Sequence, residues 1–371
     1  MAETFDAEAT AEGFRRFGRG LQGSSDLYSA ICAAIAASEA VVGLMRVTPV
    51  AQRLPMLLLA AVHDLLLAGA EHPLRSLYPS LGGTLPSIVA DAGPVFVDFC
   101  MRYTHELRPI LMHRATQTNE IGRVAAIRPL LAELADEGIS ELALAEFGAS
   151  AGLNLLVERC SIHYSDGTLV GTENAPIHIA CSLRDTPPPR SFLARALPPI
   201  TFRLGLDQSP VSALDDDATR WLLACVWPDQ LQRFRRTKAA IETAQREKPP
   251  VVQGRLPDDA LEFLRQVPPG PHLCILTTWV LAYLSEDERR ALAACVAHVA
   301  TERDITWILA ESPPFLGETG VAAAQVHGVD DDSTMLMTRH YRDGTRTDRA
   351  HAAMHGHGTW IRWFDRAGIR A

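Results

Sequence analysis

The chain has 371 residues, of which 44 are acidic and 35 are lysine or arginine, so its formal net charge is −9. That length suffices for one large core or two smaller ones. An acidic balance argues against nucleic acid as the main partner, because phosphate neutralisation requires clustered basic side chains.

Seven cysteines, without a C-x-x-C pair, indicate reduced thiols rather than a disulfide framework. Because no basic and then apolar leader begins the chain, we expect a cytoplasmic protein. The oligomeric state stays open.

The first 140 residues read as helical. Residues 28–45 and 54–70 are apolar on nearly all sides, as in a buried bundle, and amphipathic segments follow at 95–107 and 121–134. The segment 54–70 contains His63 and Asp64 and is short for a membrane span, so we interpret it as a core helix. No membrane partner is expected.

From residue 141 the pattern changes to strands that alternate with helices, which predicts βαβ units and a mostly parallel sheet. The expected strands are 142–147, 201–206, 250–253, 272–278 and 305–311. The segment 216–248 should be helical and divided by Pro228. At the end of the chain, 334–341 and 359–364 are expected to form a closing antiparallel pair.

An insertion at about 160–199 interrupts this alternation. It reads as a hairpin of 162–164 and 177–180 with a turn at Asp166-Gly167, closed by three prolines at 187–189. The expected domains are therefore a helical one at 1–140 and an α/β one at 141–371 that carries the insertion.

The segment 142–156 reads as a buried strand, a turn of small residues and a helix. Such a turn collects backbone N–H groups and a positive helix end, which suits cofactor binding. The pattern E-x-G-x-S-x-G-x-N resembles the first motif of class I methyltransferases that use S-adenosylmethionine. That resemblance implies a Rossmann-like sheet and a cofactor site at Glu146, Gly148, Ser150, Gly152 and Asn154.

Two other interpretations of this turn remain open. Its G-x-S-x-G pattern matches the nucleophile elbow of α/β hydrolases, with Ser150 as nucleophile and Glu311, His327 or His340 as partners. Such an elbow normally follows several earlier strands, which this chain lacks before residue 142. The turn can also be an ordinary one that uses small residues for packing.

Further cofactor contacts are expected at the ends of the second and fourth strands. Asp207 fits the acidic residue that binds ribose hydroxyls, although Asp166 competes and Asp207 can also be a turn or capping residue. Thr278 and Trp279 follow the fourth strand, and the Trp279 ring offers a face to a sulfonium. Trp279 and Tyr283 can equally pack the next helix at i, i+4.

A polar run precedes the helix that begins at Ile121. Gln117 and Arg123 are candidate substrate contacts, as are Tyr283 and Trp227, whereas Asn119, Glu120 and His113 are candidate catalytic groups. Glu120 and Arg123 can also be a simple surface pair at i, i+3. We expect Asn119 and Glu120 to lie near the glycine turn and to face the strand that ends at Thr278.

The chain also resembles a bacterial domain-of-unknown-function family. The shared motifs are Q-T-N-E-x-G-R (117–123), E-x-G-A-S-A-G-L-N-L (146–155), G-x-D-x-x-P (205–210), W-L-x-A-C-x-W-P-D-Q (221–230) and T-W-V-L-A-Y-L (278–284). The resemblance covers most of the chain. It implies kinship with the methyltransferase-like fold and a shared site, in which Trp227 and Asp229 take part unless they only pack a helix junction.

The histidines at 351, 355 and 357 do not have the spacing of a recognised ligand set, so no metal is predicted. The sequence thus favours a class I methyltransferase-like α/β fold behind a helical domain. We expect an S-adenosylmethionine-binding methyltransferase that acts on a small molecule. The alternatives are a hydrolase that uses Ser150 and a non-catalytic binding protein.

Overall fold

The computed structural model describes residues 5–87, 89–117, 119–317 and 333–364. They divide into two compact units, a helical unit of 1–118 and 214–238 and a sheet unit of 119–213 and 239–371. This division differs from the expected boundary at 140, because α7 (Val124–Glu133) packs within the sheet unit. There the Tyr164 hydroxyl donates to the carbonyl of Ala125 at 2.6 Å, and Arg128 donates to the carbonyl of Arg195 at 3.1 Å.

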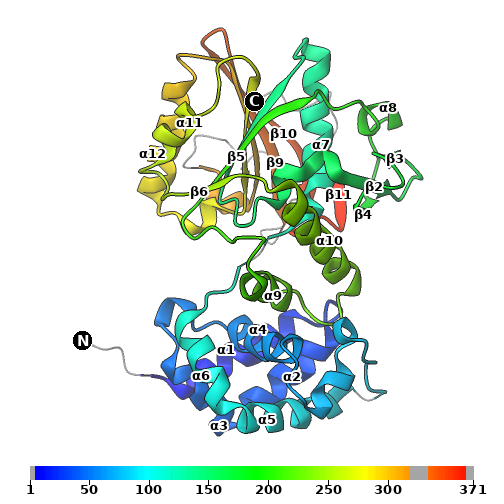
Figure 1. The fold of residues 1–371 in the computed structure, drawn as a ribbon, viewed down its shortest axis with the longest axis vertical. Coiled ribbons are helices and arrows are strands. Elements are labelled where there is room, and N and C mark those ends of the chain that lie inside the picture. Colours follow the sequence, from blue (N-terminus) through cyan, green and yellow to red (C-terminus); the bar gives the residue numbers. More distant parts are fainter. Residues whose placement is uncertain (1–4, 88, 118, 318–332, 365–371) are drawn as a thin grey trace. The chain divides into compact units, whose positions relative to one another are not determined.

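The helical unit is built from helices joined by short 3₁₀ turns (Figure 1). They are α1 (Ala7–Gly20), α2 (Asp26–Ala36), α3 (Glu39–Leu44), α4 (Pro55–Leu67), α5 (Ala92–Arg102), α6 (Thr104–His113), α9 (Asp216–Ala224) and the first part of α10 (Leu231–Glu247). The chain breaks between α9 and α10 around Pro228, as the sequence predicts. The single helix expected at 28–45 is instead two helices with a bend of 90°. Ser38 causes the break, because its side chain accepts from the Val41 amide and starts α3.

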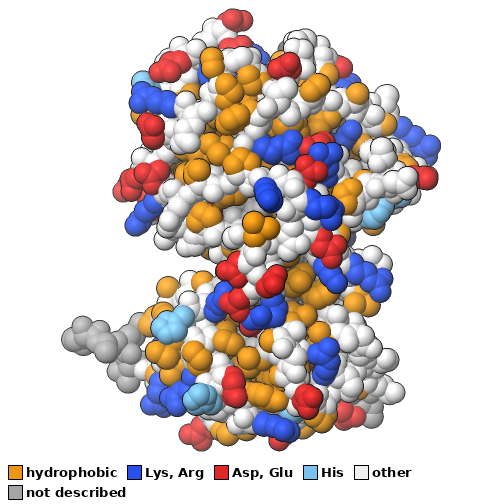
Figure 2. Space-filling model, viewed as in Figure 1, with side chains coloured by type: hydrophobic (Ala, Val, Ile, Leu, Met, Phe, Trp, Pro, Cys, Tyr) orange, Lys and Arg blue, Asp and Glu red, His pale blue; other side chains and the backbone are white. Residues whose placement is uncertain are grey.

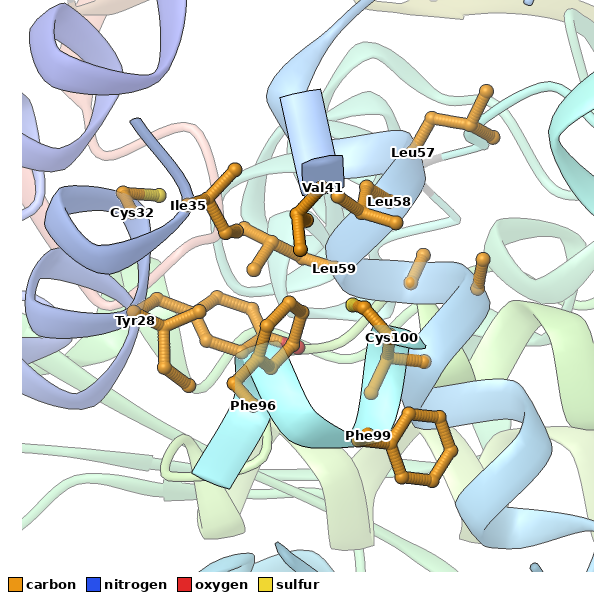
Figure 3. Packing of buried hydrophobic residues seen from close by; sticks show 14 of the residues in the cluster. Tyr28, Cys32, Ile35, Val41, Leu57, Leu58, Leu59, Phe96, Phe99 and Cys100 are labelled. Carbon is orange, nitrogen blue, oxygen red and sulfur yellow. The ribbon is translucent and has the colours of Figure 1, made fainter. Parts of the chain in front are cut away.

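The core of the helical unit surrounds α4. Figure 3 shows Tyr28 and Ile35 of α2, Val41 of α3 and Phe96 of α5 gathered around Leu59 of α4. The two polar residues of α4 are buried and bonded: His63 contacts Ser80 Oγ at 2.9 Å, and Asp64 accepts from Arg220 at 2.9 Å. Within the described ranges, no single helix is long and apolar enough to cross a bilayer. Taken together, the bent pair Asp26–Ala36 and Glu39–Val47 is long and apolar enough by length and composition alone.

The described part of the sheet unit forms one sheet of eleven strands in the order β3-β2-β4-β11-β10-β9-β8-β7-β1-β5-β6. The five strands predicted as parallel are all present and pair in parallel. They are β1 (Leu142–Phe147), β5 (Ile200–Asp207), β6 (Val251–Gln253), β7 (His272–Thr278) and β8 (Ile305–Glu311). The fold is therefore α/β with a large, mostly parallel mixed sheet.

Helices cover both faces of this parallel half, with α11 (Ala260–Arg265) and α12 (Glu286–Val299) on one side and α7 on the other (Figure 1). Ala143, Ala145 and Phe147 of β1 join a core cluster with α11 and α12. Because side chains alternate along a strand, Glu146 points to the opposite face. Figure 2 shows acidic and basic side chains interspersed on the visible face of the described residues.

The end of the chain folds differently from the expected pair. β9 (Thr334–Arg342) pairs with β10 (Thr345–Met354), a strand that the sequence analysis missed, and β11 (Trp360–Trp363) pairs with β10 and β4. The β9–β10 hairpin turns at Asp343 and Gly344, which have φ values of 47° and 73°. An Asp-Gly turn with both φ values positive is favoured in two-residue hairpins.

The insertion extends the sheet instead of forming a separate hairpin. β2 (Cys160–Tyr164) pairs antiparallel with β3 (Leu169–Val170) but parallel with β4 (Ile177–Leu183). The predicted turn at Asp166-Gly167 is present, but it leads into β3. The hairpin prediction for 162–164 and 177–180 was wrong because it overlooked this two-residue strand. The short helix α8 (Arg190–Leu193) follows β4.

Candidate functional site

The strand order reverses beside β1. From β1 the chain runs outward through β5 and β6, and then returns to β7 and β8 on the other side. In open α/β sheets, ligands bind outside the carboxyl ends of the strands at such a reversal. β1 and β7 pair with Phe147 opposite Thr277, so Gly148 and Thr278 follow at the same edge. This edge is the candidate site.

The turn after β1 does not present the amide cradle that the sequence suggested. Gly148 and Ala149 donate to the carbonyl of Leu206 at 2.8 and 3.1 Å, and Gly152 donates to Ala149. The expected α-helix is a seven-residue 3₁₀ helix, η8 (Leu153–Arg159), with non-helical geometry at Leu156. The amides of Gly148 and Ala149 are therefore taken up by the neighbouring strand and that of Gly152 by the turn itself, and η8 has no long run of aligned peptide dipoles.

Small residues are nevertheless required in this turn. Gly148, Ser150 and Gly152 have φ values of 68°, 52° and 68°. A Cβ on Gly148 would lie 2.5 Å from Cγ2 of Val280. The turn thus brings the carboxyl ends of β1 and β7 close together, at a backbone geometry that glycine adopts without strain.

Side chains form the centre of the site. Glu146 Oε1 accepts from Nδ2 of Asn154 at 2.7 Å, and the same Nδ2 lies 3.4 Å from Oγ1 of Thr278. All three side chains are buried. The structure therefore brings together three of the predicted cofactor residues, each from a different element.

Two acceptors in this group are unsatisfied. Glu146 Oε2 and Asn154 Oδ1 are buried without a hydrogen-bond partner among the described residues. A buried unpaired polar atom costs free energy, so such a pair indicates a place that a donor group of a ligand fills. Burial raises the pKa of Glu146 to about 8, and nearby Asp207 acts in the same direction, whereas Asn154 and Arg123 oppose it. A cationic donor placed at Oε2 would oppose this shift and favour the carboxylate form, which accepts at both oxygens.

Asp207 lies at the end of β5, the direct neighbour of β1. Its Oδ2 accepts from the amide of Ser150 at 2.7 Å and its Oδ1 from the amide of Ser209 at 2.8 Å. The competitor Asp166 lies in the β2–β3 turn, where it bonds Thr168 and Arg190. Since β2 is separated from β1 by six strands of the sheet, only Asp207 is at the edge that carries Glu146.

Arg123 and Glu120 are buried parts of the sheet unit and not a surface pair. Arg123 donates from Nη1 to the carbonyl of Thr278 and from Nε to the carbonyl of Gly356, both at 2.9 Å. Glu120 Oε1 accepts from the amide of Gly122 at 2.9 Å. Asn119 is half-buried, and its Nδ2 atom is buried without a hydrogen-bond partner. This segment therefore lies beside the end of β7.

Trp279 and Tyr283 have different surroundings, and they are not a pair that packs the next helix. Trp279 has a φ of 60°, and its indole N–H donates to Oγ1 of Thr334 at 2.7 Å. A Cβ built on Gly356 would meet its ring at 3.7 Å. Tyr283 is 80% exposed, so the structure does not bring it into this group.

Glu311, which the sequence analysis named only as a possible acid partner of Ser150, lies at the end of β8 at this same edge of the sheet. Its carboxylate accepts from the amides of Val280 and Leu281 at 3.0 and 3.2 Å and thereby fixes the chain after Trp279. Burial raises the pKa of Glu311 to about 7, and these amide bonds oppose the shift. An acidic residue that directly follows the apolar run 305–310 was the available signal.

The sequence analysis missed the loop His355–Gly358. It follows β10, and it receives the Arg123 bond at Gly356. His357 Nδ1 lies 3.5 Å from Oε2 of Glu120. A Cβ on Gly358 would lie 2.1 Å from the carbonyl oxygen of Gly122, so this loop runs directly against the 120–123 segment. The two glycines of H-G-H-G were the signal for such a close approach.

Three predicted residues belong to the helical unit. His113 ends α6 and is exposed. The backbone of Gln117 hydrogen-bonds the Cys225 thiol, and the Trp227 ring lies 6.3 Å from that of Tyr28. Both contacts are made within the helical unit, so Gln117 and Trp227 stabilise that unit. Asp229 likewise accepts from the Ser25 hydroxyl at 2.6 Å.

No group of three or more metal-binding side chains is found among the described residues. His351 is bonded to Thr338 between β10 and β9. Among the proposed hydrolase partners, His327 lies outside the described residues. His340 is opposite Thr306 at the start of β8, so it lies at the other end of the sheet from Ser150. It therefore cannot serve as the histidine partner of Ser150.

Residues 11–363 match the family described as "Uncharacterized protein conserved in bacteria (DUF2332)". The chain belongs to this family. No curated protein and no solved structure matches this DUF2332 chain. The match assigns the chain to a family but gives it no function, so the functional inference rests on the geometry of the site.

Proposed function

We propose that the sheet unit binds S-adenosylmethionine at the carboxyl ends of β1, β5 and β7, and that the protein is a cytoplasmic methyltransferase for a small molecule. The observation that carries this proposal is the pair of unsatisfied acceptors, Glu146 Oε2 and Asn154 Oδ1. They lie where the strand order reverses, the position at which α/β sheets bind nucleotide-like ligands.

The residues present fit this group. An amino group brings the N–H donors that Glu146 Oε2 and Asn154 Oδ1 lack. Asp207 uses one lone pair of each oxygen for the Ser150 and Ser209 amides, and so keeps capacity for ribose hydroxyls. When bound, S-adenosylmethionine supplies an electrophilic methyl group. The chain supplies the hydrogen-bonding groups that orient it, and the Trp279 ring is an aromatic surface suited to a sulfonium.

Arg123 and Glu311 hold the backbone around Trp279 in place. Arg123 holds the carbonyl of Thr278, and Glu311 holds the amides of Val280 and Leu281, so the chain on both sides of Trp279 is fixed. Preorganised groups of this kind reduce the entropy cost of orienting a bound reactant. The seven cysteines are all free, in keeping with the proposed cytoplasmic location.

Titration calorimetry with S-adenosylmethionine and S-adenosylhomocysteine tests the proposal. Wild-type protein should bind both, and Glu146→Gln should weaken binding about tenfold or more, the loss of roughly 1.5–3 kcal/mol for a bond to a charged group. Glu141→Gln, which changes an exposed acid just before the other end of β1, is the matched control and should bind normally. Absence of heat at millimolar ligand would overturn the proposal.

A hydrolase is the second candidate, because Ser150 has the positive φ of a strained strand-to-helix turn. Ser150→Gly separates the two functions, since glycine keeps this φ and removes the hydroxyl. A hydrolase would cleave a simple aryl ester and lose that activity in the variant. A methyltransferase or a non-catalytic binding protein would keep most of its affinity for S-adenosylhomocysteine, and turnover of a methyl acceptor would then distinguish these two.

A further inference from the structure

A carboxylate and an imidazole meet beside the candidate site. Glu120 Oε2 lies 3.5 Å from Nδ1 of His357. The Glu120 side chain is fully buried, whereas 26% of the His357 side chain is exposed. A buried carboxylate next to a partly exposed histidine is the division of roles found in acid–base catalysis: the acid orients the ring, and the ring exchanges the proton.

The main chain fixes both partners. Glu120 is held by the Gly122 amide, and the backbone of Gly358 lies against Gly122 so closely that no Cβ fits. Arg123 bonds the carbonyls of Gly356 and Thr278 at once. The loop that carries His357 is therefore tied to the carboxyl end of β7, next to the Asn154 and Thr278 contacts.

We propose that Glu120 and His357 are the proton-transfer pair of this site, with His357 as proton acceptor and Glu120 as the positioning residue. The assignment rests on the proposed function, in which an acceptor with an O–H or N–H group loses a proton. In this assignment the neutral ring carries its proton on Nδ1, which faces Glu120 Oε2 across 3.5 Å, and its basic lone pair is on Nε2. The acceptor's O–H or N–H bond breaks, its electron pair stays on the acceptor, and the proton forms a new bond to Nε2. Water then takes the proton from the imidazolium.

The charges around His357 include both signs. Glu120 favours the imidazolium form. The Arg123 guanidinium, which bonds the adjacent Gly356, opposes this form. The His355 ring lies 5.3 Å away and opposes it too when it is charged.

NMR of histidine-labelled protein tests the pair without knowledge of the acceptor. In the wild type, ¹⁵N shifts should show neutral His357 protonated at Nδ1. Its titration midpoint should move to lower pH in Glu120→Gln, because the favourable negative charge is removed. Glu302→Gln, which removes an exposed acid in the turn after α12, changes net charge equally and should leave the midpoint unchanged.

An Nε2-protonated tautomer in the wild type would overturn the proposal, and so would an unchanged midpoint in folded Glu120→Gln. The tautomer measurement uses unmodified protein, so it decides the question even if Glu120→Gln does not fold. Addition of S-adenosylhomocysteine provides the link to the proposed function. If it binds without any effect on the His357 signals, the pair does not belong to that site. If it does not bind, the proposed function fails while the two pair measurements still stand.

Discussion

Arg123 bonds the carbonyl of Thr278 and the carbonyl of Gly356 with two nitrogens of one guanidinium, each at 2.9 Å. These acceptors belong to the end of β7 and to the loop after β10, and Gly356 is 233 residues from Arg123 in the chain. A single side chain thereby joins the parallel and antiparallel halves of the sheet at the candidate site.

Arg123→Lys should destabilise the protein, since one ammonium on a flexible stem does not reproduce a planar two-way fork. We expect a loss of roughly 1.5–3 kcal/mol, the worth of a hydrogen bond from a charged group. Denaturant unfolding measures it. Arg290→Lys on the exposed face of α12, where the pair with Asp287 is on the surface, should change stability by less than about 0.5 kcal/mol. Equal effects of the two substitutions would contradict this account of Arg123.

Gly358→Ala should be severely destabilising. Its φ is 68°, and the new Cβ would lie 2.1 Å from the Gly122 carbonyl oxygen, so the loop has to move. We expect a loss of at least about 3 kcal/mol and faster hydrogen exchange in 355–358. Gly344→Ala is the matched control, because its φ of 73° is similar but nothing lies within 4 Å. It should show only the left-handed strain of about 1–2 kcal/mol. A Gly358 variant as stable as the Gly344 variant would refute the close packing.

Glu146 should make stability depend on pH. Its pKa is about 8 in the folded protein and near 4.5 when unfolded. The unfolded chain therefore releases this proton first, and the contribution of Glu146 is fully present below pH 4.5 and is lost as pH rises through 8. Each unit of difference corresponds to about 1.4 kcal/mol. Unfolding free energies of Glu146→Gln and wild type, measured from pH 5 to 8, should diverge in favour of the variant as pH rises. Parallel curves would show that Glu146 is ionised throughout.

Asp207 and Asp166 should differ in ligand binding. Asp207→Asn should weaken S-adenosylhomocysteine binding by roughly 1–3 kcal/mol through loss of a charged acceptor, while Asp166→Asn should have little effect. Asp207 also accepts from the amides of Ser150 and Ser209, so thermal unfolding of both variants has to accompany the calorimetry. A larger binding loss in Asp166→Asn would assign the ribose to the β2–β3 turn.

The sequence by itself determined the parallel half of the sheet. The sequence predicts the five parallel strands β1, β5, β6, β7 and β8 within two residues of their bounds. Each strand is an apolar or mixed run bounded by Gly, Pro or polar residues, and helical segments separate the runs. The Glu146–Asn154 contact was also within reach, since both residues belong to one strand-turn-helix segment. The break at Pro228 follows from a local property of proline.

Only the tertiary structure decided the rest. The polar first half of β10 hides a strand whose partners are β9 and β11, and the two-residue β3 is too short to leave a periodic pattern. The 3₁₀ geometry of η8 arises where the turn's amides bind Leu206 on a neighbouring strand. Glu120 and His357 meet because the chain places β7, the 120–123 segment and the loop after β10 at one edge. Local propensity acts over a few residues, whereas these contacts join segments brought together only when the whole sheet has formed.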